Sequence, residues 1–407
     1  MKTNWQTKKL GEVCDVFDDG DWIEKKDQSF DGIRLIQTGN IGDGVFKDRG
    51  EKARYISEAT FKRLRCTEIL PGDLLISRLP DPVGRSCIIP NTGEKMITAV
   101  DCTIVRFNKE ILPQWFINYS LSQEYQDQIN KEIGGATRQR ISRKNLGQIE
   151  IPLPPLSEQK RILKILDEVF EKTAKAKENT EKNLQNSKEL FESYLQNVFA
   201  NRGKDWEEKK LGSLTSKIGS GATPRGGKES YKKEGISLVR SMNVHDRSFV
   251  EKNLAFIDNK QADDLVNVTL EKGDVLLNIT GASVARCCVI PDKYLPARVN
   301  QHVSIIRPKP EMIDPFFLNY LLTSKLYKDQ LLMIGGQGAT RQAITKAQLE
   351  DFSVSFPKSL SEQNAIIKKL NALSKNKKTL ETNYVCKLSD LDEFKKSILN
   401  KAFTQAL

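Results

Sequence analysis

The sequence predicts an α+β protein. It consists of two tandem globular domains of mixed α/β structure, each followed by a long helix, and the two helices pair as an antiparallel coiled coil with pseudo-two-fold symmetry. Two observations support this prediction: motifs that return at a nearly constant offset, and two helix-forming stretches with a heptad pattern of apolar residues. The predicted segments are a globular domain at 1–156, a central helix at 157–203, a second globular domain at 204–360 and a C-terminal helix at 361–407.

Short motifs occur twice, in the same order. Their offset is 201 residues at first and 204 at the end, and so small a drift indicates two copies of one unit. A protein with internal two-fold symmetry usually meets a partner that is also doubled or two-fold. The repeated motifs are Trp5-Gln-Thr-Lys-Lys-Leu-Gly11 with Trp206-Glu-Glu-Lys-Lys-Leu-Gly212, Gly72-Asp-Leu-Leu-Ile76 with Gly273-Asp-Val-Leu-Leu277, Ala136-Thr-Arg-Gln139 with Ala339-Thr-Arg-Gln342, and Leu156-Ser-Glu-Gln159 with Leu360-Ser-Glu-Gln363.

Each globular domain is predicted from short β-like runs separated by Gly, Pro and Asn, with helical stretches between them. This mixture is typical of an α+β domain. The predicted strands are 33–36, 74–76, 87–89 and 102–105 in the first copy and 275–277 and 303–306 in the second, and the predicted helices lie near 113–131 and 314–333.

The long helices are predicted from the sequence that follows each globular domain. Pro152-Leu-Pro-Pro155 ends the first β region, Ser157 is placed as the N-cap, and Glu158 suits the positive end of the helix dipole. No Pro or Gly follows before residue 200, which allows a helix of about 44 residues and about 65 Å.

Core-compatible residues form a heptad seam in both helices. Both seams contain the same irregular step, at Thr180–Leu184 and at Tyr384–Leu388, as expected for two strands of one locally unwound coiled coil. The alternative is two separate amphipathic helices, each packed on its own globular domain. The seam positions are 162, 166, 169, 173, 176, 180, 184, 187, 191, 194 and 198, and then 366, 370, 373, 377, 380, 384, 388 and 391.

Composition narrows the class of protein. The chain has 407 residues, is 38% hydrophobic and has no run of 18 apolar residues, so we expect a soluble cytoplasmic protein with no membrane segment and no signal peptide. Seven scattered cysteines without a C-x-x-C pair, and only two histidines, argue against disulfides and a histidine-rich metal site. The net charge of +11 suits a polyanionic partner or simply a basic soluble protein. Residues 1–156 carry 23 Lys and Arg against 22 Asp and Glu, so nucleic-acid binding there would need a local patch.

Catalytic motifs are scarce. The loop Gly221-Ala-Thr-Pro-Arg-Gly-Gly-Lys228 resembles a phosphate loop, but its spacing is one residue too long and Glu229 stands where a Ser or Thr would hold magnesium. There is no Asn/Asp-Pro-Pro-aromatic tetrapeptide of a methyltransferase, and Pro80-Asp81 and Pro291-Asp292 fit turns better than a nuclease motif. We therefore expect a non-catalytic chain with no metal site and no cofactor of its own.

Two glycine-rich loops suit phosphate binding. The first, at 134–144, holds four cations and no acidic residue, and the second is its repeat at 335–346. Glycines let backbone N–H groups approach a phosphate, Thr can donate to it, and Arg supplies a forked cation. The alternative is an ordinary solvated turn. The candidate DNA-binding residues in these loops are Thr137, Arg138, Arg140, Arg143, Lys144, Thr340, Arg341 and Gln342.

Polar residues after apolar strands are candidates for reading bases. Gln and Asn can pair with adenine and Arg with guanine, and Gln37 in one copy stands opposite Arg240 in the other. The two copies would then read different bases, although loop capping by Asn is the plainer alternative. The candidates are Gln37, Thr38 and Asn40 with Arg240, Ser241 and Asn243, the strand-end residues Arg78 and Asn278, and Thr223 and Arg225 from the second copy's loop.

The order and duplication of these motifs resemble the specificity (S) subunit of Type I restriction–modification enzymes, over essentially the whole chain. The second copy departs from the pattern at Pro357-Lys-Ser-Leu360, and Asp18-Asp-Gly-Asp-Trp22 replaces Gly219-Ser-Gly-Ala-Thr223. The resemblance implies that the globular units are target-recognition domains, that the coiled coil holds them apart, and that the latter difference reflects different DNA preferences.

The resemblance also implies the partners. They are double-stranded DNA, two methyltransferase (M) subunits docked on the helices, and restriction (R) subunits, with S-adenosylmethionine, ATP and magnesium belonging to the partner subunits. The expected function is recognition of a bipartite, asymmetric DNA target, one half per domain, with a spacer set by the coiled coil. Two alternatives are a catalytic nuclease or methyltransferase-associated chain with an unrecognised active site, and a coiled-coil scaffold with no DNA role.

Overall fold

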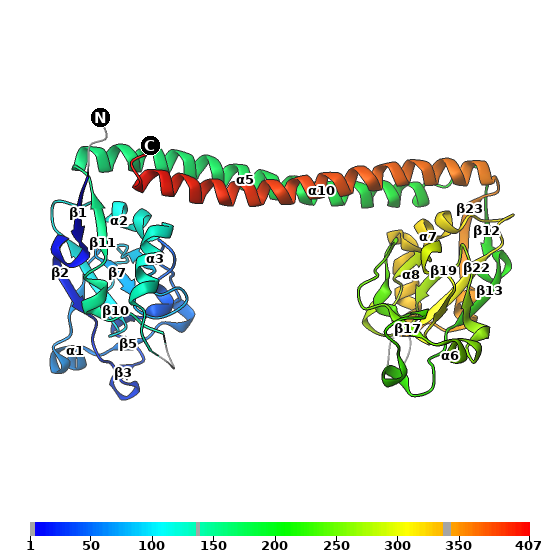
Figure 1. Ribbon diagram of the computed structural model, residues 1–407, viewed down its shortest axis with the longest axis horizontal. Coiled ribbons are helices and arrows are strands. Elements are labelled where there is room, and N and C mark those ends of the chain that lie inside the picture. The colour runs from blue at the N-terminus through cyan, green and yellow to red at the C-terminus, as the bar shows by residue number, and fades with distance from the viewer. Residues whose placement is uncertain (1–4, 136–138, 337–342) are drawn as a thin grey trace. The chain divides into compact units, whose positions relative to one another are not determined.

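The computed structural model describes residues 5–135, 139–336 and 343–407 (Figure 1). The chain forms two compact units. Unit 1 takes Met1–Glu181 together with Cys386–Leu407, and unit 2 is the continuous stretch Lys182–Val385. Each unit therefore includes one part of each long helix as well as a globular domain.

Unit 1 is built on two larger β-sheets and one two-stranded sheet, with helices packed beside them. A four-stranded antiparallel sheet has the order β2-β10-β7-β8, and a five-stranded sheet has the order β3-β5-β4-β9-β6, with β4 and β9 parallel. The strands are β1 (Gln6–Lys9) paired with β11 (Glu150–Leu153), β2 (Cys14–Asp19), β3 (Gln28–Ser29), β4 (Ile33–Ile36), β5 (Tyr55–Ile56), β6 (Glu68–Ile69), β7 (Leu74–Ser77), β8 (Ser86–Ile88), β9 (Met96–Thr98) and β10 (Cys102–Phe107), and the helices are α1 (Glu58–Leu64), α2 (Pro113–Ser120), α3 (Gln123–Glu132) and α4 (Arg143–Leu146).

Unit 2 repeats the first sheet and changes the second. The sheet β13-β22-β19-β20 has the order of β2-β10-β7-β8, whereas the other sheet has four strands, β17-β14-β21-β18, beside a separate hairpin β15-β16. The strands are β12 (Trp206–Lys210) paired with β23 (Ser353–Pro357), β13 (Thr215–Ser220), β14 (Ile236–Val239), β15 (Val244–His245), β16 (Ser248–Phe249), β17 (Ala255–Ile257), β18 (Thr269–Leu270), β19 (Val275–Asn278), β20 (Cys287–Val289), β21 (Ala297–Val299) and β22 (Val303–Pro308), and the helices are α6 (Asn259–Asp263), α7 (Pro315–Thr323), α8 (Lys325–Gly336) and α9 (Lys346–Glu350).

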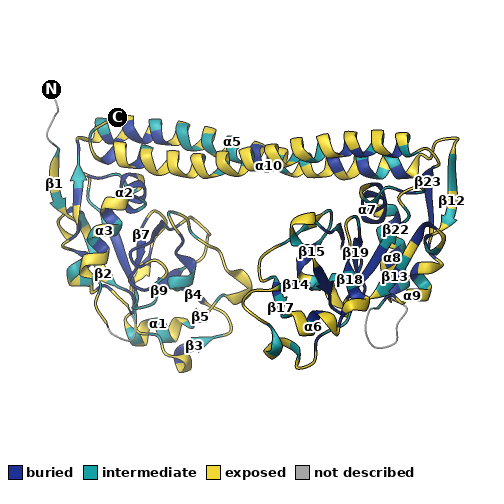
Figure 2. Cartoon of the chain, turned by 45° about the vertical axis from the view of Figure 1, so that its right-hand side comes forward, coloured by how far each residue is buried: buried dark blue, intermediate teal, exposed yellow. Residues whose placement is uncertain are grey.

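The predicted strands and helices of both domains are confirmed by β4, β7, β8, β10, β19 and β22 and by α2, α3, α7 and α8. The central strands of the larger sheets, such as β4, β7, β19 and β22, are mostly buried, whereas β1, β2 and β12 contain no buried residue (Figure 2). Short 3-10 turns connect the strands: η1 (Leu10–Val13), η2 (Lys25–Asp27), η3 (Thr38–Asn40), η4 (Gly50–Lys52), η5 (Leu211–Leu214), η6 (Gly227–Ser230), η7 (Ser241–Asn243), η8 (Val266–Val268), η9 (Gly281–Ser283) and η10 (Asp292–Tyr294).

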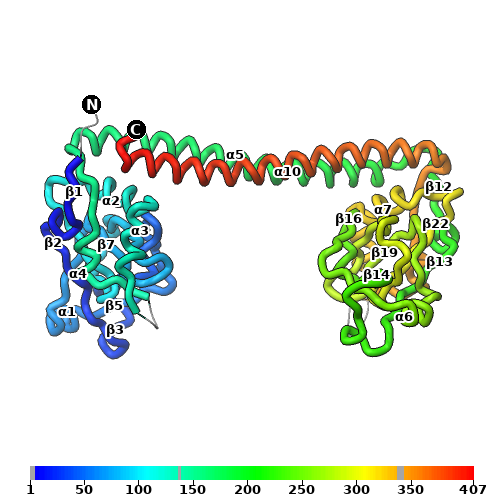
Figure 3. The backbone as a smooth tube through the Cα atoms, in the orientation of Figure 1, coloured from blue at the N-terminus to red at the C-terminus, as the bar shows by residue number. Residues whose placement is uncertain are grey.

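The long helices are α5 (Leu156–Ala200) and α10 (Leu360–Phe403), each traced without interruption in Figure 3. In unit 1 the first turns of α5 share a core with the last turns of α10, and in unit 2 the last turns of α5 share a core with the first turns of α10. The pairing is therefore antiparallel within each unit, which confirms the predicted fold class. Every predicted seam residue is buried or half-buried except Leu380, which is 43% exposed.

The helix ends also enter the globular cores. In unit 1 the ring of Phe403 lies 4.8 Å from that of Trp115, and in unit 2 the ring of Phe199 lies 5.6 Å from that of Phe317, centroid to centroid. The alternative of two separate helices, each packed on its own globular domain, is not supported, because the first turns of α5 lie in the core of unit 1 and its last turns in the core of unit 2, in both cases together with α10.

The repeated Leu-Ser-Glu-Gln motif fastens each helix to the domain before it. Gln159 is fully buried, accepts the N–H of Leu112 at 2.9 Å and donates to the carbonyls of Glu110 and Pro154, both at 2.9 Å. Gln363 makes the equivalent three bonds in unit 2. The prediction of Ser157 as N-cap is wrong: α5 already begins at Leu156, because the carbonyl of the preceding proline accepts the first helical N–H groups.

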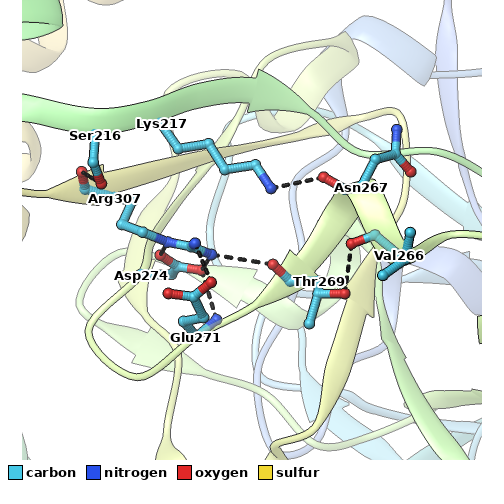
Figure 4. A network of polar contacts seen from close by, with 8 residues as sticks. All are labelled: Ser216, Lys217, Val266, Asn267, Thr269, Glu271, Asp274 and Arg307. Carbon is cyan, nitrogen blue, oxygen red and sulfur yellow. Dashed lines mark hydrogen bonds and ion pairs between the residues drawn. The ribbon is translucent and has the colours of Figure 1, made fainter.

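The aspartate of the repeated Gly-Asp motif ties neighbouring strands together in the four-stranded sheet that both units share. Asp73 receives two hydrogen bonds from Arg106, both at 2.7 Å, and Asp274 receives two from Arg307, at 2.8 and 2.9 Å. Figure 4 shows Arg307 enclosed by Asp274, Glu271 and the carbonyl of Thr269. Such two-pronged pairing satisfies a carboxylate that is almost fully buried.

Candidate nucleic-acid interface

Three loops that are distant in the sequence meet in unit 1. Arg85 holds two of them together, because its guanidinium donates to the carbonyl of Thr38 at 2.9 Å and to that of Leu79 at 3.0 Å. The third loop joins through the N–H of Ile141, which donates to the carbonyl of Arg78 at 3.2 Å. The polar loop after β4, the end of β7 and the glycine-rich loop before α4 are thus neighbours, as a composite binding surface requires.

The cations of this surface are unequally available. Arg78 is only 3% exposed, donates to the carbonyl of Val100 and pairs with Asp19 at 3.2 Å. Burial lowers the pKa of Arg78, and Asp19 opposes that shift. Arg143 is half-buried, and donates to the carbonyl of Phe17 at 3.0 Å and to Asp18. Arg140 and Lys144 are exposed, so both remain accessible to a phosphate.

The asparagines of the polar loops are structural. Asn40 is buried: its Oδ1 accepts the N–H of Gln37 and its Nδ2 donates to the carbonyl of Lys47, both at 3.0 Å. Asn243, fully buried, bonds Arg240 and Val250 in the same way. Loop capping, the plainer alternative, therefore describes both residues, and pairing with adenine would first require the loop to open.

The other candidates of these loops lie partly on the domain itself. Gln37, Thr38 and Ser241 are half-buried, while Asn278 is fully buried and donates to the carbonyl of Ser241 at 2.9 Å. Arg240 donates to the carbonyl of Asn253 and lies over the ring of Tyr231, 5.5 Å from its centroid. These contacts hold the arginine against the domain.

Unit 2 has a hollow at the equivalent place. The hollow has a volume of about 670 Å³ and lies where the N–H of Ile344 donates to the carbonyl of Ile279 at 2.9 Å, as Ile141 and Arg78 do in unit 1. Thr223 donates to the amide oxygen of Gln301 nearby, and Arg225 is exposed. The residues lining the hollow are Ser241, Met242, Thr280, Gly281, Ala282, Ser283, Arg286, His302 and Ala343.

Five candidates of the glycine-rich loops lie outside the described residues: Thr137, Arg138, Thr340, Arg341 and Gln342. Conversely, the structure adds two polar residues in unit 2 that the sequence did not single out, Gln301 and His302. In unit 1 it shows that Asp18 and Asp19, from the divergent segment 18–22, pair with Arg143 and Arg78. The available signal was the alignment of the two copies, in which His302 stands opposite Asp101.

Within residues 5–135, 139–336 and 343–407, no group of three or more His, Cys, Asp or Glu side chains is arranged to hold a metal ion. Among the helices of these same stretches, none combines the length and the apolar character needed to span a bilayer.

Comparison with known proteins agrees with the internal repeat. The family model for the type I restriction modification DNA specificity domain matches twice, at residues 2–186 and 203–384. The putative type I restriction enzyme MjaX specificity subunit of Methanocaldococcus jannaschii is 26% identical, over 91% of this chain and 87% of that protein. The EcoKI specificity subunit of Escherichia coli K12 is 23% identical, over 93% and 84%.

Solved structures share the fold. A chain from a structure of the type I R-M system gives a TM-score of 0.77 at 20% identity, covering 100% of this chain and 99% of that one. The HsdS subunit from Thermoanaerobacter tengcongensis gives a TM-score of 0.66 at 19% identity, covering 100% and 98%. With two matches to the domain model that together span most of the sequence, this chain belongs to the family of type I restriction modification DNA specificity proteins.

Proposed function

We propose that this chain is the DNA-specificity subunit of a Type I restriction–modification complex and that it recognises a bipartite, asymmetric target, one half per unit. The observation that carries the proposal is the duplicated specificity domain, whose two copies keep one sheet order and present different side chains at their loop surfaces. Two identical recognition domains would favour a symmetric DNA target, whereas two domains with the same fold and different loop side chains favour an asymmetric one.

The chain is proposed to be non-catalytic and to act in the cytoplasm on chromosomal DNA. Its clustered loop residues are those of binding: arginines, lysines, amides and hydroxyls near glycine-rich backbone. Methyl transfer and cleavage would then fall to two methyltransferase subunits and to restriction subunits, which would bring S-adenosylmethionine, ATP and magnesium.

The helices α5 and α10 are proposed to set the unread spacer between the half-sites. Their pairing within each unit fixes which part of one helix lies beside which part of the other. The length of the paired helices, rather than a flexible linker, would then decide how many base pairs separate the halves.

The decisive experiment is sequencing of methylated bases in cells that express the chain with its cognate methyltransferase subunit. We expect one interrupted motif with two different halves. Cells expressing either subunit alone are the controls and should show no such motif. A continuous or palindromic motif, or methylation by the methyltransferase subunit alone, would contradict the proposal.

A further inference from the structure

One turn in each unit occupies the same backbone position and carries different side chains. In unit 1 the N–H of Arg78 donates to the carbonyl of Asp101 at 2.9 Å, and in unit 2 the N–H of Ile279 donates to the carbonyl of His302 at 3.0 Å. These equivalent bonds place Asp101 opposite His302. Because the backbone bond is conserved, the side chain can vary here without a change in the sheet.

The neighbouring loop extends this correspondence. Gly20 N–H donates to the carbonyl of Cys102 in unit 1 and Gly221 N–H to that of Val303 in unit 2, at 2.9 and 3.0 Å. The glycines are required there, since a Cβ on either would lie within 2.5 Å of backbone atoms. With this register, the side chains of unit 1 and their equivalents in unit 2 are Trp22 and Thr223, Leu79 and Thr280, Val100 and Gln301, and Asp101 and His302.

In unit 2 these four side chains form one hydrogen-bonded row. Thr223 donates to the amide oxygen of Gln301, whose Nε2 lies 3.2 Å from Nε2 of His302, and Nδ1 of His302 lies 2.7 Å from the hydroxyl of Thr280. The amide nitrogen of Gln301 can only donate a hydrogen bond, so Nε2 of His302 accepts it. The network therefore assigns the imidazole proton to Nδ1, where it donates to Thr280.

The row leaves defined groups for a ligand. Gln301 is exposed, and its amide keeps one N–H and one oxygen lone pair after the contacts to Thr223 and His302. That pair matches the N7 acceptor and the N6 donor of adenine in the major groove. Thr280 keeps its O–H as a donor, and Arg286 lines the same hollow, where it can meet a phosphate.

Unit 1 cannot make the same contact. Val100 has no polar side-chain atom, and its carbonyl is already taken by the guanidinium of Arg78. The methyl groups of Val100, which is half-buried, suit the methyl group of thymine rather than the edge of adenine. At this position the two units therefore offer a base different chemistry on a shared backbone.

We propose that Gln301 reads an adenine in the half-site of unit 2, and that Thr223 and His302 are positioning residues that hold its amide in the reading orientation. The proposal rests on the function proposed above and adds to it the residue and the base.

The test uses the full chain with its methyltransferase subunit and measures the methylated fraction at every genomic site. Gln301→Ala should lower the preference for adenine at one position of one half-site by about ten-fold, and leave the other half and the spacer unchanged. Gln301→Glu should move that preference toward cytosine, whose N4 amino group donates to a carboxylate.

The positioning role has its own readout. His302→Ala should weaken the preference at the same adenine position, and His302→Gln, which restores an acceptor for the amide of Gln301, should recover most of it. The matched control is Val100→Gln at the equivalent turn of unit 1, which should leave the half-site of unit 2 unchanged.

Failure of the proposed function and failure of the Gln301 assignment would give different results. If the wild-type chain directs no bipartite methylation, the proposed function itself fails. If wild-type methylation is bipartite but Gln301→Ala and Gln301→Glu keep every base preference, the assignment of Gln301 is overturned. A uniform loss of methylation at all sites with an unchanged melting temperature would make Gln301 a general affinity residue, and would equally overturn base reading.

Discussion

Unit 1 and unit 2 share the same four-stranded sheet and differ in their second sheet. Both have the same order in the four-stranded sheet, the same Asp–Arg pair and the same glutamine at the helix start. The second sheet has five strands in unit 1 and four beside a hairpin in unit 2. Buried polar groups must keep their partners, so these positions tolerate little change, whereas exposed turns can diverge at small energetic cost.

A second difference concerns the attachment of the variable part. Gly44 in unit 1 and Arg247 in unit 2 stand at the same place with positive φ, and Arg247 there pairs with Glu192 of α5 at 2.6 Å. Unit 2 thus ties its hairpin to the helix by an ion pair that unit 1, with glycine, does not have. The two units share the four-stranded sheet and its buried polar pairs, and they differ in the side chains of their exposed turns.

The largest effect is expected from exchanging residues 201–360 for the equivalent domain of another family member. If the units read independently, one half of the methylated motif should be replaced entirely and the other half kept. Sequencing of methylated sites is the measurement. A change in both halves would show that the two readers are coupled.

Truncating the aromatic residue at the end of each long helix should destabilise one unit and leave the other unchanged. Phe199→Ala should destabilise unit 2 and Phe403→Ala should destabilise unit 1, each by about 3–5 kcal/mol, because both rings are buried in a core. Hydrogen exchange resolved by segment would locate the loss. Leu190→Ala, at a residue that is 73% exposed, is the control and should cost less than about 0.5 kcal/mol. Equal loosening of both units by either change would argue against separate cores.

Lengthening the helix between the units tests the spacer. Insertion of four residues after Thr180 adds about 6 Å of helix, compared with about 3.4 Å per base pair. The methylated motif should keep both halves and gain a spacer longer by about one to two base pairs. The insertion roughly preserves the apolar seam, since a heptad alternates steps of three and four. A folded, active variant that still uses the original spacing would show that the helices do not measure it.

The smallest effects are expected at the glycine-rich loops. Arg138→Ala and Arg341→Ala should weaken binding to all sequences alike and reduce the slope of log K against log salt by roughly 1 each, because phosphate contacts carry no base information. Titration of binding against salt, with target and unrelated duplexes, gives both quantities. An altered motif with an unchanged slope would make these arginines base readers instead.

The repeat, the long helices, their heptad seam and most strands of the four-stranded sheet shared by the two units could be predicted from the amino-acid sequence alone. These features are local or periodic: an offset, a missing proline or glycine, and a spacing of three and four can be read without knowing which residues meet. The family resemblance followed from the same motifs and is confirmed by the two domain matches.

Which polar residues remain available to a ligand depends on the fold and could not be predicted from the sequence. Asn40 and Asn243 match a base-reading pattern in the sequence, yet their amides are buried and bonded to their own loops, and Arg78 is buried against Asp19. Gln301 and His302 carry no motif, and become candidates because β22 and the end of β19 bring them to Thr223 and Thr280. Exposure and hydrogen-bond partnership depend on contacts between segments far apart in the chain, and no local pattern of residues specifies those contacts.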